Sequence, residues 1–128
     1  MQLPTIIAVA SGGAIGATAR MLINGFVNSR MPHALPFGTL TVNLIGSLFI
    51  GILFAYFHLN EHFSLHLKTF LVTGILGALT TYSTFAMESF LLLESGHYGH
   101  AFLNMALNLF GTIVMAGLGY MLLLQLTK

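Results

Sequence analysis

"GILGALTTYSTF", residues 74–85, lies within a long apolar stretch, yet it combines two glycines with a cluster of hydroxyl and aromatic side chains. Gly74 and Gly77 weaken a helix at this point, because glycine is about 1 kcal/mol less favourable than alanine inside a helix. Four hydroxyl residues follow directly: Thr80, Thr81, Ser83 and Thr84. What these residues do depends on whether water or lipid surrounds the segment.

The composition indicates that lipid is the surrounding solvent. Of the 128 residues, 56% are hydrophobic and only 5% are charged, whereas a soluble domain averages about 25% charged residues. The length suits one domain, residues 1–128. The absence of cysteine excludes disulfides and thiolate metal sites. A formal net charge of +1 with no basic run argues against a nucleic-acid partner.

Four segments are long and apolar enough to cross a bilayer as helices, which takes about 20 residues each. They are residues 4–27, 38–59, 67–93 and 98–126. No Lys or Arg precedes the first segment, so we interpret it as a span and not as a signal peptide. The connections are too short for a soluble domain, so both termini are expected on one side. The predicted fold is therefore an all-α, four-helix transmembrane domain.

The charged residues give almost no orientation signal. Lys68 and Lys128 flank one side of the predicted membrane domain, while Arg30, and with it Arg20, lies towards the other. Because an excess of Lys and Arg normally marks the cytoplasmic side, this even distribution favours dual topology, with copies pairing antiparallel. The alternative is a single orientation set by these few charges and a partner protein.

Polar residues recur along the predicted spans at helical spacing. The second span carries Thr39, Asn43 and Ser47, and the fourth carries Asn104, Asn108 and Thr112. Such residues either hydrogen-bond between helices or line a water-filled path through the membrane. Because they form two regular stripes, one along each of these two spans, we favour the path. Amide and hydroxyl donors, together with the electropositive ring edges of aromatic residues, suit a small anion.

Two charged residues fall within the predicted spans, where a charge is unfavourable. Arg20 either extends to the lipid headgroups or faces a water-filled vestibule. For Glu88 we favour a structural hydrogen bond over a role in proton transfer.

The glycines predict a break near the middle of the third span. If Gly74 and Gly77 unwind the helix there, the freed carbonyls must be buried in protein or face water. Such carbonyls can hold Na⁺, and two antiparallel chains could share one ion on their two-fold axis. The alternative is that these glycines only allow close helix packing, as expected for Gly12 and Gly16.

Three motifs extend over most of the chain. They are "GGAIGATAR" at residues 12–20, "PFGTLTVNLIG" at residues 36–46 and "GILGALTTYSTFAME" at residues 74–88. In this order and at these spacings, the sequence resembles the Fluc (CrcB-type) family of bacterial fluoride channels. The resemblance implies a multi-pass protein of the bacterial inner membrane that is not an enzyme. It would export fluoride and so confer fluoride resistance.

The resemblance also implies a dual-topology homodimer in lipid, with two antiparallel fluoride pores and a structural Na⁺ at its centre. Asn43 would be the pore amide, Phe85 would offer its ring edge, and the carbonyls of Gly77 and Thr80 would hold the Na⁺. Together with the polar pattern, it gives seven candidate pore-lining residues: Asn43, Tyr82, Ser83, Thr84, Phe85, Asn108 and Thr112. The chain departs from the family pattern at Tyr82, where Phe is usual, and at Ala78, where Gly is usual.

Three other functions compete with a channel. A small dual-topology multidrug exporter would be expected to carry a carboxylate in the first span, which has only Arg20. A membrane metalloenzyme could use "HLNEHFSLH", residues 58–66, which contains the H-x-x-E-H order of one class of zinc peptidase. A passive membrane assembly subunit would conduct nothing by itself.

Overall fold

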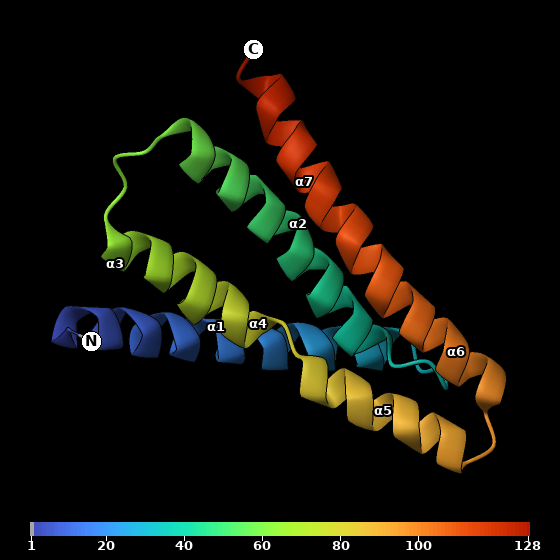
Figure 1. The fold of residues 1–128 in the computed structure, drawn as a ribbon. Helices are drawn as coiled ribbons and strands as arrows, with labels where there is room; N and C mark the ends of the chain where they lie inside the picture. The colour runs from blue at the N-terminus through green and yellow to red at the C-terminus, as the bar shows by residue number, and fades with distance from the viewer. Residues whose placement is uncertain (1) are drawn as a thin grey trace.

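The computed structural model describes residues 2–128, which fold into helices joined by short connections (Figure 1). The first two spans are α1 (Leu3–Arg30) and α2 (Phe37–Leu59). The third consists of α3 (Leu65–Lys68), the π-helical η1 (Thr69–Leu76), α4 (Gly77–Leu79) and α5 (Tyr82–Glu94). The fourth consists of α6 (Tyr98–Ala106), the π-helical η2 (Leu107–Gly111) and α7 (Thr112–Leu126).

These helices confirm the four predicted spans. Four stretches are long and apolar enough to cross a membrane: Leu3–Arg30, Phe37–Leu59, Leu65–Glu94 and Tyr98–Leu126. Each begins or ends within a few residues of the predicted bound. Pro4 lies in the first turn of α1, where its missing amide hydrogen is no loss. Gly96 has a φ of +84° in the turn between α5 and α6, a conformation that favours glycine.

The spans pack as two pairs that diverge from each other. Figure 1 shows α1 running beside α3 and α4, and α2 running beside α7. The α1 pair depends on glycines, because a Cβ at Gly12 would lie 3.0 Å from the Gly74 Cα, and one at Gly16 would strike the Ile75 carbonyl. These contacts confirm close packing for Gly12 and Gly16, and they give Gly74 the same role.

The second pair is built in the same way. A Cβ at Gly51 would strike the Ala116 carbonyl, and one at Gly119 would strike the Leu48 carbonyl. Where the two pairs meet, the buried core is small and centres on Val42, Leu76 and Leu79. Small residues therefore bring the backbones together, and the large apolar side chains face outward, as expected for a protein surrounded by lipid.

The third span is interrupted near its middle, but not where the glycines predicted. Gly77 has helical angles (φ −62°, ψ −34°), and the Thr80 amide still bonds to the Leu76 carbonyl at 3.1 Å. The chain is extended instead at Thr80 (ψ 155°) and Thr81 (φ −148°, ψ 119°), after which α5 begins. The prediction that Gly74 and Gly77 themselves break the helix is therefore wrong.

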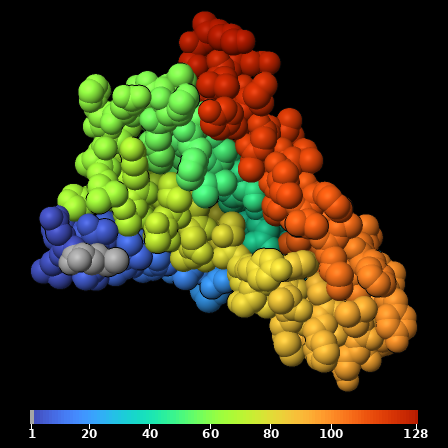
Figure 2. Space-filling model, in the orientation of Figure 1, coloured from blue at the N-terminus to red at the C-terminus, as the bar shows by residue number. Residues whose placement is uncertain are grey.

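The break gives the molecule its outline. Beyond it, α5 continues the third span away from α3 and α4 and packs beside α6 (Figure 1). Figure 2 shows this end, coloured yellow to orange, projecting as a lobe from the rest of the molecule. At the break, the hydroxyl of Thr81 accepts the Thr84 amide at 3.3 Å and so caps the start of α5.

A candidate ion pathway at the helix break

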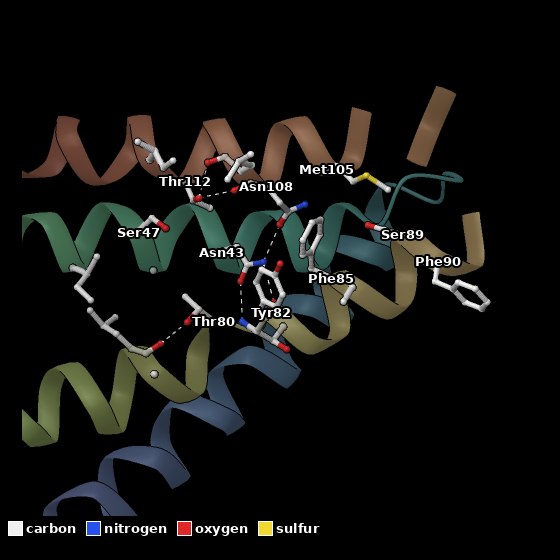
Figure 3. Close-up of a pocket in the computed structure, with 18 of the residues that line it drawn as sticks. Asn43, Ser47, Thr80, Tyr82, Phe85, Ser89, Phe90, Met105, Asn108 and Thr112 are labelled. Atoms are coloured by element: carbon white, nitrogen blue, oxygen red, sulfur yellow. Dashed lines mark hydrogen bonds between the residues drawn. The ribbon is translucent and has the colours of Figure 1, made fainter. Parts of the chain in front are cut away.

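A groove of about 890 Å³ lies against the break in the third span (Figure 3). Its walls come from α2, from both sides of the break, and from the fourth span. The polar side chains that line it are those of Asn43, Ser47, Thr80, Thr81, Tyr82, Ser89, Asn108 and Thr112. None of its described lining residues carries a charge.

Asn43 holds the backbone of the break. Its side-chain oxygen accepts the Thr81 amide at 2.8 Å, and its nitrogen donates to the Thr81 carbonyl at 3.2 Å. The side-chain amide thus bonds to both the amide and the carbonyl of one residue, as a neighbouring strand does in a sheet. Asn43 is only 8% exposed. One buried amide therefore satisfies the polar backbone groups that the extended conformation of Thr81 leaves outside the helix.

The same arrangement frees two backbone carbonyls. In a continuous helix the Thr81 amide would donate to Gly77, and the Thr84 amide would donate to Thr80. Here the Thr81 amide donates to Asn43 instead, and the Thr84 amide to the Thr81 hydroxyl. The carbonyls of Gly77 and Thr80, which the family resemblance names as Na⁺ ligands, thus lose their helical partners beside the groove.

The two predicted polar stripes meet in one hydrogen-bonded network. Asn43 donates to the Asn108 side chain at 2.9 Å, Asn108 donates to the Asn104 side chain at 3.1 Å, and Asn104 donates to Ser89 at 2.9 Å. Hydrogen bonds between helices, the alternative interpretation of the stripes, are therefore confirmed for these asparagines. That the same residues line an ion path stays a prediction.

Glu88 forms a similar bond between spans. Thr39 donates to one of its carboxylate oxygens at 2.6 Å, which confirms the expected structural hydrogen bond. The other carboxylate oxygen is buried and has no partner among residues 2–128.

Two aromatic rings pack edge to face at the groove. The centroids of Tyr82 and Phe85 lie 5.4 Å apart, with 70° between the ring planes, so the edge of one ring points at the other. Both line the groove, but Tyr82 is 81% exposed, whereas Phe85 is half-buried. Ring edges carry partial positive charge, so this pair can present an electropositive surface to an anion.

Three predicted site residues lie elsewhere. Ser83 is exposed, and Thr84 is engaged with Thr81, and neither lines the groove. Arg20 is half-buried on α1 and forms no hydrogen bond with any residue from 2 to 128, which leaves both of its interpretations open. The sequence interpretation missed Ser89, although its spacing of one helical turn from Phe85 places it on the same face of α5.

The histidines of residues 58–66 do not assemble a metal site. Across residues 2–128, no group of three or more His, Cys, Asp or Glu side chains is placed to hold a metal ion. His58 ends up on α2 and His66 on α3, where its ring nitrogen lies 3.3 Å from the Thr5 hydroxyl.

Four apolar spans, and an uncharged groove that carries both polar and apolar side chains at a helix break, fit an ion channel or a small transporter. Residues 7–120 match the family described as CrcB-like protein, Camphor Resistance (CrcB), and the chain belongs to this family. It is also similar to proteins named Fluoride-specific ion channel FluC. The one from Sulfurimonas denitrificans is 60% identical over 120 residues, which cover 94% of this chain and 93% of that protein.

Relatives with the same name occur in other bacteria. The protein from Campylobacter fetus is 47% identical over 121 residues, covering 94% of each chain. One from Campylobacter jejuni is 48% identical over 121 residues, covering 94% of this chain and 98% of that protein. These matches confirm the family resemblance that the three motifs carried.

Proposed function

We propose that this protein is a fluoride-selective ion channel of the bacterial inner membrane. The observation that carries the proposal is its 60% identity, over nearly the full length, to a protein named as a fluoride-specific ion channel. Its four helical spans make it a multi-pass membrane protein. Because hydrogen fluoride crosses membranes as a neutral acid and dissociates inside, a fluoride-selective leak lowers the internal load and confers resistance.

The chemistry of the groove supports an anion as the conducted ion. Its lining combines hydroxyl and amide groups with three aromatic rings, and its described residues include no carboxylate. A pore for cations would be expected to use acidic side chains or rings of carbonyls. Family membership favours a channel over the exporter, the assembly subunit and the metalloenzyme.

The proposal includes an antiparallel pair of chains. In one chain the groove is open on one side, and large apolar residues surround it: Tyr82, Phe90, Leu109 and Ile113. A second copy would close the groove and cover these residues. The balance of Lys68 and Lys128 against Arg20 and Arg30 supports an inverted second copy over a parallel one.

The proposal also includes one structural Na⁺ on the two-fold axis of the pair. The carbonyls of Gly77 and Thr80 fit this role, because the break removes the amides that would otherwise bond to them. One chain offers two such oxygens and two chains offer four, a number that can replace the hydration of a monovalent cation. The ion would stabilise the break without itself being conducted.

Fluoride efflux tests the proposed function. Purified protein is reconstituted into liposomes loaded with potassium fluoride, and external fluoride is followed with an electrode after valinomycin is added. We expect rapid fluoride release and little chloride release from liposomes loaded with chloride. No fluoride release from a preparation shown to be folded and dimeric would exclude the proposal.

A further inference from the structure

The asparagines of the groove have no amide hydrogens left for an ion. Asn43 gives its two to the Thr81 carbonyl and to Asn108. Asn108 gives its two to the backbone and side-chain oxygens of Asn104. Because a primary amide has two hydrogens to donate, neither side chain can contact an anion as a donor without breaking a bond inside the chain.

The hydroxyl groups of the groove differ from one another in whether their hydrogen is already donated within the chain. Those of Thr80 and Thr112 donate to helix carbonyls one turn earlier. Ser47 lines the groove without any hydrogen bond to residues 2–128 that would orient it, and the Tyr82 hydroxyl belongs to an 81% exposed side chain. Ser89 is only 4% exposed and accepts a bond from Asn104, but donates to no atom of residues 2–128.

Ser89 stands at the end of a chain of hydrogen bonds that all run in one direction. The Thr81 amide donates to Asn43, and Asn43 donates to Asn108. Asn108 then donates to Asn104, and Asn104 donates to Ser89. The orientation of Asn43 is fixed because its oxygen faces a backbone amide and its nitrogen faces a backbone carbonyl. Bonds aligned in this way polarise one another, so the last hydroxyl is a stronger donor.

We infer that Ser89 is the hydroxyl donor that contacts the conducted anion in the groove, and that Asn104 positions it. The inference rests on the proposed function. A small anion of high charge density, such as fluoride, accepts short, charge-assisted hydrogen bonds from hydroxyls, and the free proton of a nearly buried serine needs an acceptor. Phe85 lies one helical turn before Ser89 and lines the same groove, so its ring edge and this hydroxyl can flank one ion. Figure 3 labels both residues on α5.

Three variants test the role of the Ser89 proton. Ser89→Ala removes it and should lower the fluoride efflux rate in liposomes about ten- to a hundredfold, as expected when an ion loses one donor. Ser89→Thr keeps the hydroxyl and should recover most of the rate. Thr41→Val removes a hydroxyl that only donates to the Phe37 carbonyl on α2, and should leave the rate unchanged. Elution as a folded dimer is confirmed for each variant.

A double-mutant cycle tests the positioning role of Asn104. Asn104→Leu should lower the ratio of fluoride to chloride efflux, because the Ser89 hydroxyl is no longer oriented. Adding Asn104→Leu to Ser89→Ala should change that ratio little further, because the two residues act through one proton. If Asn104→Leu does not fold, the comparison between Ser89→Ala and Ser89→Thr decides alone.

The outcomes separate this inference from the proposed function. Wild-type protein that releases no fluoride would overturn the function itself. Wild-type conduction with unchanged efflux in Ser89→Ala, or losses that simply add in the cycle, would overturn the inference and leave the function standing.

Discussion

At the scale of single residues, Asn43 shows how one side chain decides local structure. The family resemblance implies that it is a pore amide, but its hydrogens and its oxygen are engaged with Thr81 and Asn108. The same Asn43 side chain therefore lines the groove and bonds to the backbone at the break. In this structure its bonds hold the backbone at the point where the third span unwinds.

Asn43→Asp should therefore destabilise the fold as well as reduce fluoride efflux. A carboxylate cannot donate to the Thr81 carbonyl or to Asn108, and leaving a buried polar group without its partner costs about 1–3 kcal/mol. We expect a lower melting temperature in detergent, measured by intrinsic fluorescence or light scattering. Asn60→Asp is the matched control, because Asn60 is exposed at the end of α2. Equal melting temperatures for the two variants would contradict this role.

Phe85 offers a test of the ring edge at the same scale. Phe85→Ile keeps apolar bulk in the groove but removes an aromatic ring with its electropositive edge. We expect fluoride efflux in liposomes to fall at least tenfold while the protein stays folded. Phe102→Ile, on an exposed part of α6 outside the groove, is the control and should conduct normally.

At the scale of elements, the glycines of α1 set how closely it approaches the third span. The Cβ of alanine at Gly16 would strike the Ile75 carbonyl, which is backbone and cannot move aside. Overpacking of this kind costs about 1–3 kcal/mol. Gly16→Ala should therefore lower the melting temperature in detergent.

Gly13→Ala is the matched control for that prediction. A Cβ at Gly13 meets no atom within 4 Å, so the substitution should be neutral or stabilise the helix by up to about 1 kcal/mol. If both variants melt at the same temperature, the close contact between α1 and η1 does not hold in the protein.

The break itself is the second feature at this scale. If carbonyls of Gly77 and Thr80 from two chains hold Na⁺, then exchange of Na⁺ for N-methylglucamine during purification should weaken the dimer and reduce fluoride efflux. Returning Na⁺ should restore both, and the same concentration of choline should not. Size exclusion in detergent and efflux from liposomes measure the two effects. Identical dimers and rates after complete exchange would contradict the sodium site.

At the scale of the whole molecule, the few charges leave the orientation open. Adding two or three Lys residues to the connection at residues 31–36, beside Arg30, should force one orientation, because positive loops stay in the cytoplasm. Such a copy should not conduct alone if the functional unit is antiparallel. Conduction should return when it is co-expressed with a copy biased the opposite way, as measured by fluoride resistance of cells. Full function of one forced orientation would exclude the antiparallel pair.

The sequence by itself determined the spans, the family and the identity of most polar groups in the groove. The spans could be predicted because crossing a bilayer requires a run of apolar residues of known length, which is a local property of the chain. Asn43, Asn108 and Thr112 could be named as site candidates because polar residues recur at helical spacing along the second and fourth spans. Phe85 could be named as a pore ring from the family resemblance.

Only the tertiary structure decided where the third span breaks and which buried hydroxyl keeps a free proton. Helix propensity placed the break at Gly74 and Gly77, but propensity is weak compared with a buried amide that pairs with the backbone. That amide belongs to Asn43, 38 residues away from Thr81, and it reaches the backbone only when α2 crosses the third span at this point. Ser89 stands out for the same reason, because a free proton can be recognised only after every bond between the spans is known.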